Sequence, residues 1–351
     1  MKLRDAILSI VWTCIVFGVH AQIGGKSAYE FLSLPASARI TALGGHLISV
    51  HDEDVSLALG NPATLNDKMH NRFSIAHNFH FADIQNGYVS YGRKLDKWKL
   101  NTHLGIHYVN YGEFVRADVL GQQDGTFGAK ETAIVLGASK QLADRITAGV
   151  NIKGVFSNFE SFSSTGLVAD LGLNYAKDSS GLIVSFVVKN LGSELSTFNE
   201  NRFGAPLDIQ IGLSKRLKYL PFRFSIIAHQ LQRGNIRYDD PSNIQQTDIF
   251  GEEIKENRFA EITDNIFRHI ILSGEFLLGR NENLRLRAGY NHLRRKELSL
   301  STFRSLAGFS LGFGFKINVF KLDYGVGYHH IAGATNHVTI STDMGKFFKK
   351  L

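Results

Sequence analysis

The chain has 351 residues, of which 44% are hydrophobic and 20% are charged, and it contains 34 Gly and 26 Phe. Its mean hydropathy is −0.07, and past the N-terminus it has no apolar run of the roughly 18 residues that a spanning helix needs, which excludes a bundle of membrane helices. The formal net charge is +7, but the basic residues are scattered and form no dense tract, so the charge does not indicate nucleic acid as a partner.

The N-terminus has the organisation of a secretory signal peptide. A short basic start is followed by the apolar stretch 6–19 and by small residues up to Ala21. We expect cleavage after Ala21, so that residues 1–21 are removed. The alternative, an uncleaved anchor helix, would need a longer apolar core. The only cysteine, Cys14, lies in this stretch, so the mature chain is expected to hold no disulfide and no thiolate site.

Residues 22–70 do not alternate between apolar and polar positions. A short helix is predicted around 36–43, closed by Gly44 and Gly45, and a second one could start with Asp54 as its N-cap and end at Gly60-Asn61-Pro62. The glycine pair lacks the Lys-Ser/Thr of a phosphate-binding loop. Because the lumen of a wide barrel must be filled or form a channel, we expect 22–70 to be a hatch, a plug inside the barrel that the following residues predict.

From Phe73 to the end, the sequence repeats stretches of about ten residues that alternate apolar with polar or small side chains. Strands in soluble sandwiches are usually shorter than these, whereas a tilted membrane strand needs about 9–11 residues. The pattern predicts residues 71–351 to be a 14-stranded antiparallel transmembrane β-barrel, all-β apart from the hatch. The expected strands are 72–80, 86–94, 97–111, 130–142, 146–158, 164–177, 181–191, 205–217, 222–233, 265–278, 283–293, 305–317, 319–330 and 336–347.

The connections between these strands support the count. Every second connection is very short, as at Leu95-Asp96 and Asn318, and the others are longer, including 112–129 and 234–264. Barrels of bacterial outer membranes have an even strand number, short periplasmic turns and longer outer loops. We therefore expect an outer-membrane, multi-pass protein with both termini in the periplasm.

Charged side chains on the polar face of the strands would point into the lumen. We expect them to solvate or hold the hatch, whose best-placed charges are Arg39, Asp52 and Asp54. This structural role is favoured over a substrate path. The expected lumen residues are Lys153, Asp170, Asn174, Glu275, Arg285, Arg287, Lys321 and Asp323.

The hatch segment also carries a family resemblance. The runs FLSLPASARITALGG (31–45) and SVHDEDVSLALGNPA (49–63) resemble the N-terminal signature of the PorQ family, barrels of the Bacteroidetes type IX secretion system. They are similar, more distantly, to the PorV and FadL-like barrels, and Lys189-Asn190-Leu191-Gly192 resembles a recurring element of these families. The signature positions are Pro35, Arg39, Gly44, Gly45, Asp52, Asp54, Asn61 and Pro62. The C-terminus departs from the usual pattern, because Lys349-Lys350-Leu351 follows the aromatic pair at 347–348.

The resemblance implies a 14-stranded barrel with an N-terminal hatch and a role in protein secretion and cell-surface attachment. In that role the barrel would anchor a PorZ-like surface protein alongside PorU and PorV, within outer-membrane lipid and lipopolysaccharide. The longest polar loop, 234–264, is either the candidate partner loop or a disordered surface loop. Its candidate contacts are Asp239, Asp240, Glu252 and Glu253. The alternative function, implied by the FadL-like barrels, is transport of hydrophobic small molecules or lipids, with an apolar groove and a gapped strand wall near the hatch.

No catalytic residue, cofactor site or metal site is predicted. The chain has 14 histidines, and two of them, His103 and His107, share one strand face, but lumen or rim positions explain them without a metal. Ser341 and His337 share a face of the last expected strand, yet nothing in their spacing distinguishes them from ordinary lumen residues. The sequence therefore predicts a protein that is not an enzyme.

Overall fold

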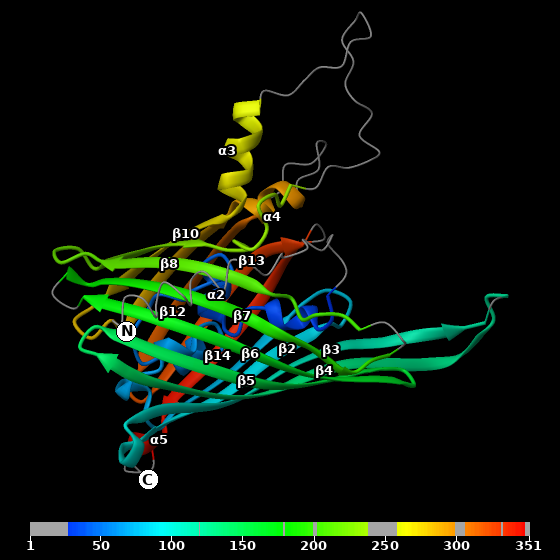
Figure 1. The fold of residues 1–351 in the computed structure, drawn as a ribbon, viewed down its shortest axis with the longest axis horizontal. Helices are drawn as coiled ribbons and strands as arrows, with labels where there is room; N and C mark the ends of the chain where they lie inside the picture. The colour runs from blue at the N-terminus through cyan, green and yellow to red at the C-terminus, as the bar shows by residue number, and fades with distance from the viewer. Residues whose placement is uncertain are drawn as a thin grey trace, which may run out of the picture.

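In the computed structural model, fourteen antiparallel strands close into one barrel (Figure 1). The structure describes residues 27–118, 120–177, 180–198, 202–237, 258–298, 306–330 and 333–347. The predicted strand number, order and antiparallel pairing are confirmed. The strands are β1 Arg72–Phe79, β2 Gln85–Leu95, β3 Leu100–Ala117, β4 Gln123–Ala143, β5 Ile146–Phe159, β6 Phe162–Lys177, β7 Leu182–Ser196, β8 Asp208–Arg216, β9 Phe222–Ala228, β10 Ile270–Leu278, β11 Leu284–Asn291, β12 Phe309–Ile317, β13 Phe320–His330 and β14 Gly333–Asp343.

The barrel closes through β1, which pairs with β2 on one side and with β14 on the other. All neighbours along the chain pair in sequence, so each connection joins adjacent strands. We call the end where β1 begins the short-turn end and the opposite end the hairpin end. At the short-turn end, short connections such as Asn318–Val319 join the strands.

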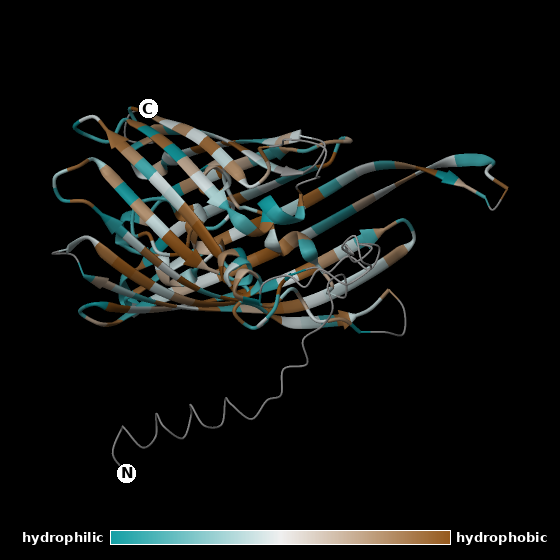
Figure 2. Cartoon of the chain, turned by 90° about the horizontal axis from the view of Figure 1, so that it is seen from above, coloured by the Kyte–Doolittle hydropathy of each residue, from teal (hydrophilic) through white to brown (hydrophobic). Residues whose placement is uncertain are grey.

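The alternation places apolar side chains outside and polar side chains inside. On β5, Ile152 is 52% exposed, whereas Asn151 and Lys153 are fully buried. This arrangement is the reverse of that in a soluble protein, where apolar side chains lie inside. It extends around the barrel, and Figure 2 shows hydrophobic bands that alternate with polar ones along the strands. An apolar outer wall suits contact with hydrocarbon rather than water. Among the described residues, no helix is long and apolar enough to cross a membrane.

Several predicted strand boundaries are wrong. Residues 112–129 were expected to be a loop, but β3 and β4 continue through a bulge at Gly112 into a hairpin that projects beyond the barrel (Figure 1). Phe114 and Phe127 stack across this hairpin with ring centroids 5.4 Å apart, so cross-strand aromatic packing extends the ladder.

Other expected strands are shorter than predicted. Residues 265–268 belong to the helix α3 Arg258–Arg268, and the last expected strand ends in the helix α5 Met344–Phe347. Residues 229–233 lie outside β9 and are not helical. The apolar side chains of α3 that resemble a strand start fall on one helix face instead. The remaining helix beyond the hatch is α4 His292–Glu297, which follows β11, and the turn between β2 and β3 is a 3₁₀ turn, η5 Asp96–Trp98.

Residues 27–70 lie inside the barrel (Figure 1). Their elements are η1 Glu30–Ser33, α2 Ala38–Ala42, η2 Val55–Leu59, η3 Pro62–Thr64 and η4 Asp67–Met69. The local signals for these elements are readable, because Asp54 caps η2 by accepting from the Ser56 amide and Asn61 caps η3 by accepting from the Ala63 amide. The second predicted helix, the one capped by Asp54, is the 3₁₀ helix η2, which has five residues. We keep the name hatch for residues 27–70.

The barrel wall has glycines, without side chains, where the hatch backbone contacts it. A Cβ atom on Gly289 would meet the backbone of Leu43 and Gly44, and one on Gly325 would meet the carbonyl group of Ala38. Only glycine leaves room for such a close backbone approach. The inward glycines of β11 and β13 therefore match the path of α2.

Candidate functional site

The hatch is fastened by Arg39, a fully buried arginine on α2. Its guanidinium group donates to Asp52 from Nη2 at 2.8 Å and to Asp54 from Nη1 at 3.1 Å, and its Nε atom donates to Glu275 of β10 at 2.9 Å. Arg39 is 1% exposed, so its charge requires these partners. One side chain thus ties the two halves of the hatch to each other and to the wall.

Glu275 is the centre of a wider ion cluster. Besides Arg39, it accepts from Arg223 of β9 at 2.8 Å and from Arg287 of β11 at 3.0 Å. Arg287 also donates to Asp323 of β13 at 2.6 Å. A carboxylate with three arginines would be costly in a dry lumen unless further anions balanced the charge, and the hatch carboxylates and Asp323 supply them.

Two carboxyl groups of the hatch, those of Asp52 and Glu53, have lowered pKa values. Burial raises the pKa of the Asp52 carboxyl, but the charges of Arg39 and Arg223 outweigh burial and hold that pKa well below its usual range. Burial and the charge of Asp52 also raise the pKa of Glu53, yet nearby cations including Lys321 lower it overall. The pairing is therefore complete near neutral pH.

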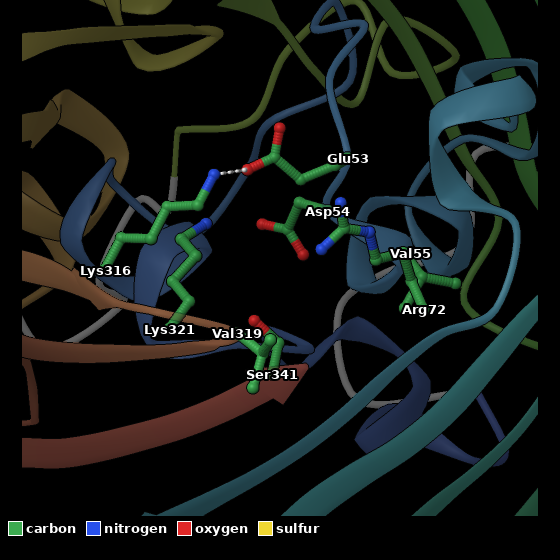
Figure 3. A pocket seen from close by; sticks show the side chains of 8 residues that line it. All are labelled: Glu53, Asp54, Val55, Arg72, Lys316, Val319, Lys321 and Ser341. Atoms are coloured by element: carbon green, nitrogen blue, oxygen red, sulfur yellow. Dashed lines mark ion pairs between the residues drawn. The ribbon is translucent and has the colours of Figure 1, made fainter. Parts of the chain in front are cut away.

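A small pocket at the short-turn end continues this cluster (Figure 3). It is lined by Glu53, Asp54, Lys316 and Lys321 among others, and Lys316 Nζ lies 3.8 Å from Glu53 Oε1. Arg285 Nη2 lies 3.4 Å from the same oxygen. Charged groups of both signs therefore face each other where the lumen would open at this end.

A second polar set holds η2 and η3 against β5 and β6. Asn61 donates to the side-chain oxygen of Asn174 at 2.8 Å, and Asn174 donates to the carbonyl oxygen of Ala63 at 2.8 Å. Asn151 donates to the carbonyl oxygen of Ala58 at 2.9 Å and to Asp170 at 3.0 Å.

Lys153 completes this set. Its Nζ atom lies 2.8 Å from Asp170 and donates to Asn190 at 2.8 Å. Asn190 has a positive φ of 58° and lies where the β6–β7 register is interrupted. Its backbone N–H group donates to Asp170 at 2.9 Å. The irregularity in the β6–β7 pairing therefore lies at a buried ion pair, Lys153–Asp170.

An apolar layer lines the lumen wall between Lys153 and Asp170 on one side and the buried Glu131 and Glu194 on the other. Inward side chains of β3 to β6 form an apolar patch, and the first hatch residues pack on it. Phe31 also lies against His107, with ring centroids 5.4 Å apart. The patch consists of Val109, Ala133, Val135, Val155 and Val168, and the hatch residues buried in the same cluster include Tyr29, Phe31 and Leu32.

The pairing of β8 with β9 is short. It stops at Ile211–Ala228, and beyond that pair the two segments are joined by one backbone bond, from the Leu231 amide to the Ile209 carbonyl oxygen at 3.1 Å, together with side-chain bonds. Asp208 Oδ1 accepts from the Gln230 amide at 2.7 Å, and Gln232 Oε1 accepts from the Ile209 amide at 3.0 Å. A cavity of about 250 Å³ lies between this stretch, the hatch and α4.

The structure brings most predicted hatch positions together with the lumen charges. Arg39, Asp52 and Asp54 meet Glu275, as described above. Gly44 and Gly45, with φ of 88° and 92°, end α2, and the Gly45 amide donates to the carbonyl oxygen of Ile40 at 3.0 Å. Pro35 is buried, and Pro62 begins η3 behind its cap Asn61.

Other predicted residues fall elsewhere. The candidate partner residues Asp239, Asp240, Glu252 and Glu253 lie outside the described residues. His337 bonds to Thr41 of the hatch at 2.8 Å rather than to Ser341, and His103 bonds to Asn151 at 2.9 Å. These histidines act as lumen side chains in the structure.

Sequence reasoning missed Arg223 and the surroundings of the β8–β9 cavity. Arg223 could have been found, because Phe222, Phe224 and Ile226 mark the outward face of β9 and leave position 223 inside. His46, Asp208 and His229 line the cavity from three separate segments. No spacing in the sequence joins those three.

Comparison with known proteins identifies the fold. No protein-family model matches the sequence, and no curated protein matches it. A solved structure of the monoaromatic hydrocarbon channel TodX, a deltaS2 mutant, superposes with a TM-score of 0.52 at 14% identity, covering 89% of this chain and 98% of that one. A FadL homologue from Pseudomonas aeruginosa superposes with a TM-score of 0.50 at 8% identity, covering 88% and 98%.

The superpositions establish the architecture, but sequence identities this low do not identify a ligand. The shared feature is the closed ring of fourteen antiparallel strands. The chain therefore has the fold of the FadL-like 14-stranded barrels.

Proposed function

We propose that this chain is a non-enzymatic outer-membrane channel for small hydrophobic molecules, closed by its hatch. The observation that carries the proposal is the apolar patch of β3 to β6 under Tyr29, Phe31 and Leu32. A lumen that held its plug through charges alone would need no such apolar patch. An apolar surface covered by a separately fastened segment can bind a hydrophobic molecule when that segment shifts.

The cavity beside β8 and β9 supports an entry route. It lies at the hairpin end, which we expect to face the outside, and its lining includes Pro206, Leu207 and Leu293 beside polar groups. The adjacent wall is held partly by side chains, which are easier to rearrange than a continuous ladder. The solved channel of the same fold that carries monoaromatic hydrocarbons gives the class of probe to try first.

Uptake tests the proposal. In a bacterial host without its own barrel of this fold, the full chain should increase entry of radiolabelled toluene or oleate over the empty host. Phe31→Ala should increase it further, because it uncovers the apolar patch. Met69→Ala is the matched control, since it removes apolar volume from the hatch in a separate buried cluster. Equal uptake with and without the chain would contradict the channel.

The second candidate is docking of a surface protein in type IX secretion, with PorZ-like, PorU and PorV partners. The hatch signature motivates it, and one structural observation favours it: α3, which packs near α4 and β10, exposes Phe259, Ile262 and Ile266. Exposed apolar side chains of this kind suit a protein partner.

Mild-detergent purification separates the two candidates. Docking predicts that a large partner co-purifies with the chain and is lost when Phe259, Ile262 and Ile266 are all replaced by serine, while uptake stays unchanged. The channel predicts uptake without a partner. Recovery of the barrel alone from its native membrane, with normal cargo attachment in a deletion strain, would contradict docking.

A further inference from the structure

Three potential metal ligands converge beside the β8–β9 cavity. His46 comes from the hatch just after Gly45, Asp208 is the first residue of β8, and His229 directly follows β9. One ligand atom from each lies within 4.8 Å of the other two. The rings of His46 and His229 stack with centroids 5.2 Å apart. All three side chains line the same cavity of about 250 Å³.

His229 has an unused nitrogen at this point. The residue is only 3% exposed, and its Nε2 atom is buried without a hydrogen-bond partner. The ring bonds to the backbone of Arg268, and Nε2 is a ring nitrogen without a partner. A histidine that binds metal commonly has its other ring nitrogen fixed by a backbone carbonyl in this way. A buried imidazole nitrogen without a partner is costly unless a ligand satisfies it.

The other two ligands are also held in place. Asp208 uses Oδ1 to accept from the Gln230 amide at 2.7 Å, and its Oδ2 atom accepts from the Gln210 side chain. The same Gln210 Nε2 atom lies 3.1 Å from His46 Nδ1. A donor group with partial positive charge therefore sits between two prospective ligands. The carbonyl oxygen of that amide, Gln210 Oε1, is buried without a partner and becomes a further oxygen donor if the amide rotates by 180°.

We propose that His46, Asp208 and His229 bind a divalent transition-metal ion, with zinc as the representative. Two imidazoles and one carboxylate are a donor set that zinc and its neighbours prefer, and the cavity leaves room for water at an open position. Metal bonds of about 2.0–2.2 Å place ligand atoms roughly 3.3 Å apart, so the three side chains must close inward by about one ångström from their present separation.

The charges around the cluster select the kind of ion. Lys189 and Arg294 act on His46, and Asp208 is the one carboxylate among the three ligands. Magnesium and calcium, which depend on several oxygen anions, are disfavoured here. Ions that form strong bonds to imidazole nitrogen are favoured. The bound ion would join the hatch to both β8 and β9 beyond the last residue pair of those two strands.

Calorimetric titration of the metal-stripped full chain in detergent tests this site. With zinc chloride we expect one equivalent to bind, with at least tenfold weaker binding in His46→Ala and in His229→Ala. Magnesium chloride should give no heat of binding. His51→Ala is the matched control, because it removes an exposed hatch histidine and should leave the zinc affinity unchanged.

A second measurement guards against misfolded variants. Zinc should raise the temperature at which the wild-type chain unfolds, because a ligand that binds only the folded state stabilises it. It should not raise that temperature in His46→Ala, a change outside the barrel wall. The proposal is overturned if the wild type binds no zinc, or if His46→Ala and His229→Ala bind it as tightly as the wild type.

Discussion

Arg39 of the hatch and Glu275 of β10 form a two-point ion pair across 236 residues of sequence, with Nε to Oε1 at 2.9 Å and Nη2 to Oε2 at 3.1 Å. Glu275 is 2% exposed and Arg39 is 1% exposed. A bidentate contact between a planar guanidinium and a carboxylate fixes orientation as well as distance. The pair therefore determines how α2 sits in the lumen.

Glu275→Gln should loosen the hatch strongly. The change leaves Arg39, Arg223 and Arg287 around a neutral side chain, and removing one partner of a buried pair costs about 3–5 kcal/mol. The temperature at which the folded gel band of an unboiled sample converts to the unfolded band should drop. Glu131→Gln is the control, since Glu131 is also buried but bonds to Tyr111 and Ser157 rather than to a cation. An equal drop in both variants would contradict the role of the ion cluster.

Acid should weaken the hatch only below the usual pKa of an aspartate. The pKa of Asp52 is depressed in the folded state, so its pairing contributes fully above the unfolded value of about 4 and is lost as the pH falls through the folded value. Asp52→Asn should unfold at a lower temperature than the wild type at neutral pH. The difference should shrink as the pH falls below about 4. A difference that stays constant over this range would show that Asp52 is not paired as described.

Gly325→Ala should displace α2 without preventing barrel formation. The added Cβ would collide with the carbonyl oxygen of Ala38, and overpacking of this kind costs about 1–3 kcal/mol. Limited proteolysis should cut the hatch faster in this variant. Gly154→Ala is the matched control, because its Cβ would meet only Phe156 at 3.9 Å. Equal cleavage rates in the two variants would contradict the close packing of α2 on β13.

The sequence predicted the barrel well because outward and inward positions differ in chemistry along every strand. It predicted strand ends poorly where a second effect competes with alternation. Gly112 permits a bulge through which β3 continues, and Ile266 and Phe267 suit either a strand start or the apolar face of α3. The hatch charges were predictable because Arg39, Asp52 and Asp54 are charged residues in a segment that must be buried.

Contacts between distant segments were not predictable in the same way. Arg223 follows from strand parity, but its choice of Glu275 depends on how neighbouring strands are staggered. His46, Asp208 and His229 share no motif, and only the folded barrel brings them together. The resemblance to type IX secretion barrels rests on the hatch signature, while the similarity to solved structures extends to the fold alone.

The central claim, a hatch that must shift for hydrophobic molecules to pass, is tested by a reversible cross-link. Ser49 of the hatch and Ser214 of β8 have their Oγ atoms 2.6 Å apart, which suits a disulfide after replacement of both by cysteine. Outside position 14 the chain has no cysteine, so no other thiol competes. Ser214→Cys alone is the control, and free-thiol labelling confirms that the cross-link has formed.

Uptake of radiolabelled toluene and oleate by cells carrying Ser49→Cys with Ser214→Cys is the decisive measurement. The account predicts that uptake falls to the level of the empty host when the cross-link is oxidised and returns when dithiothreitol reduces it. Uptake that is the same in the oxidised and reduced states, with the cross-link verified, would contradict the account.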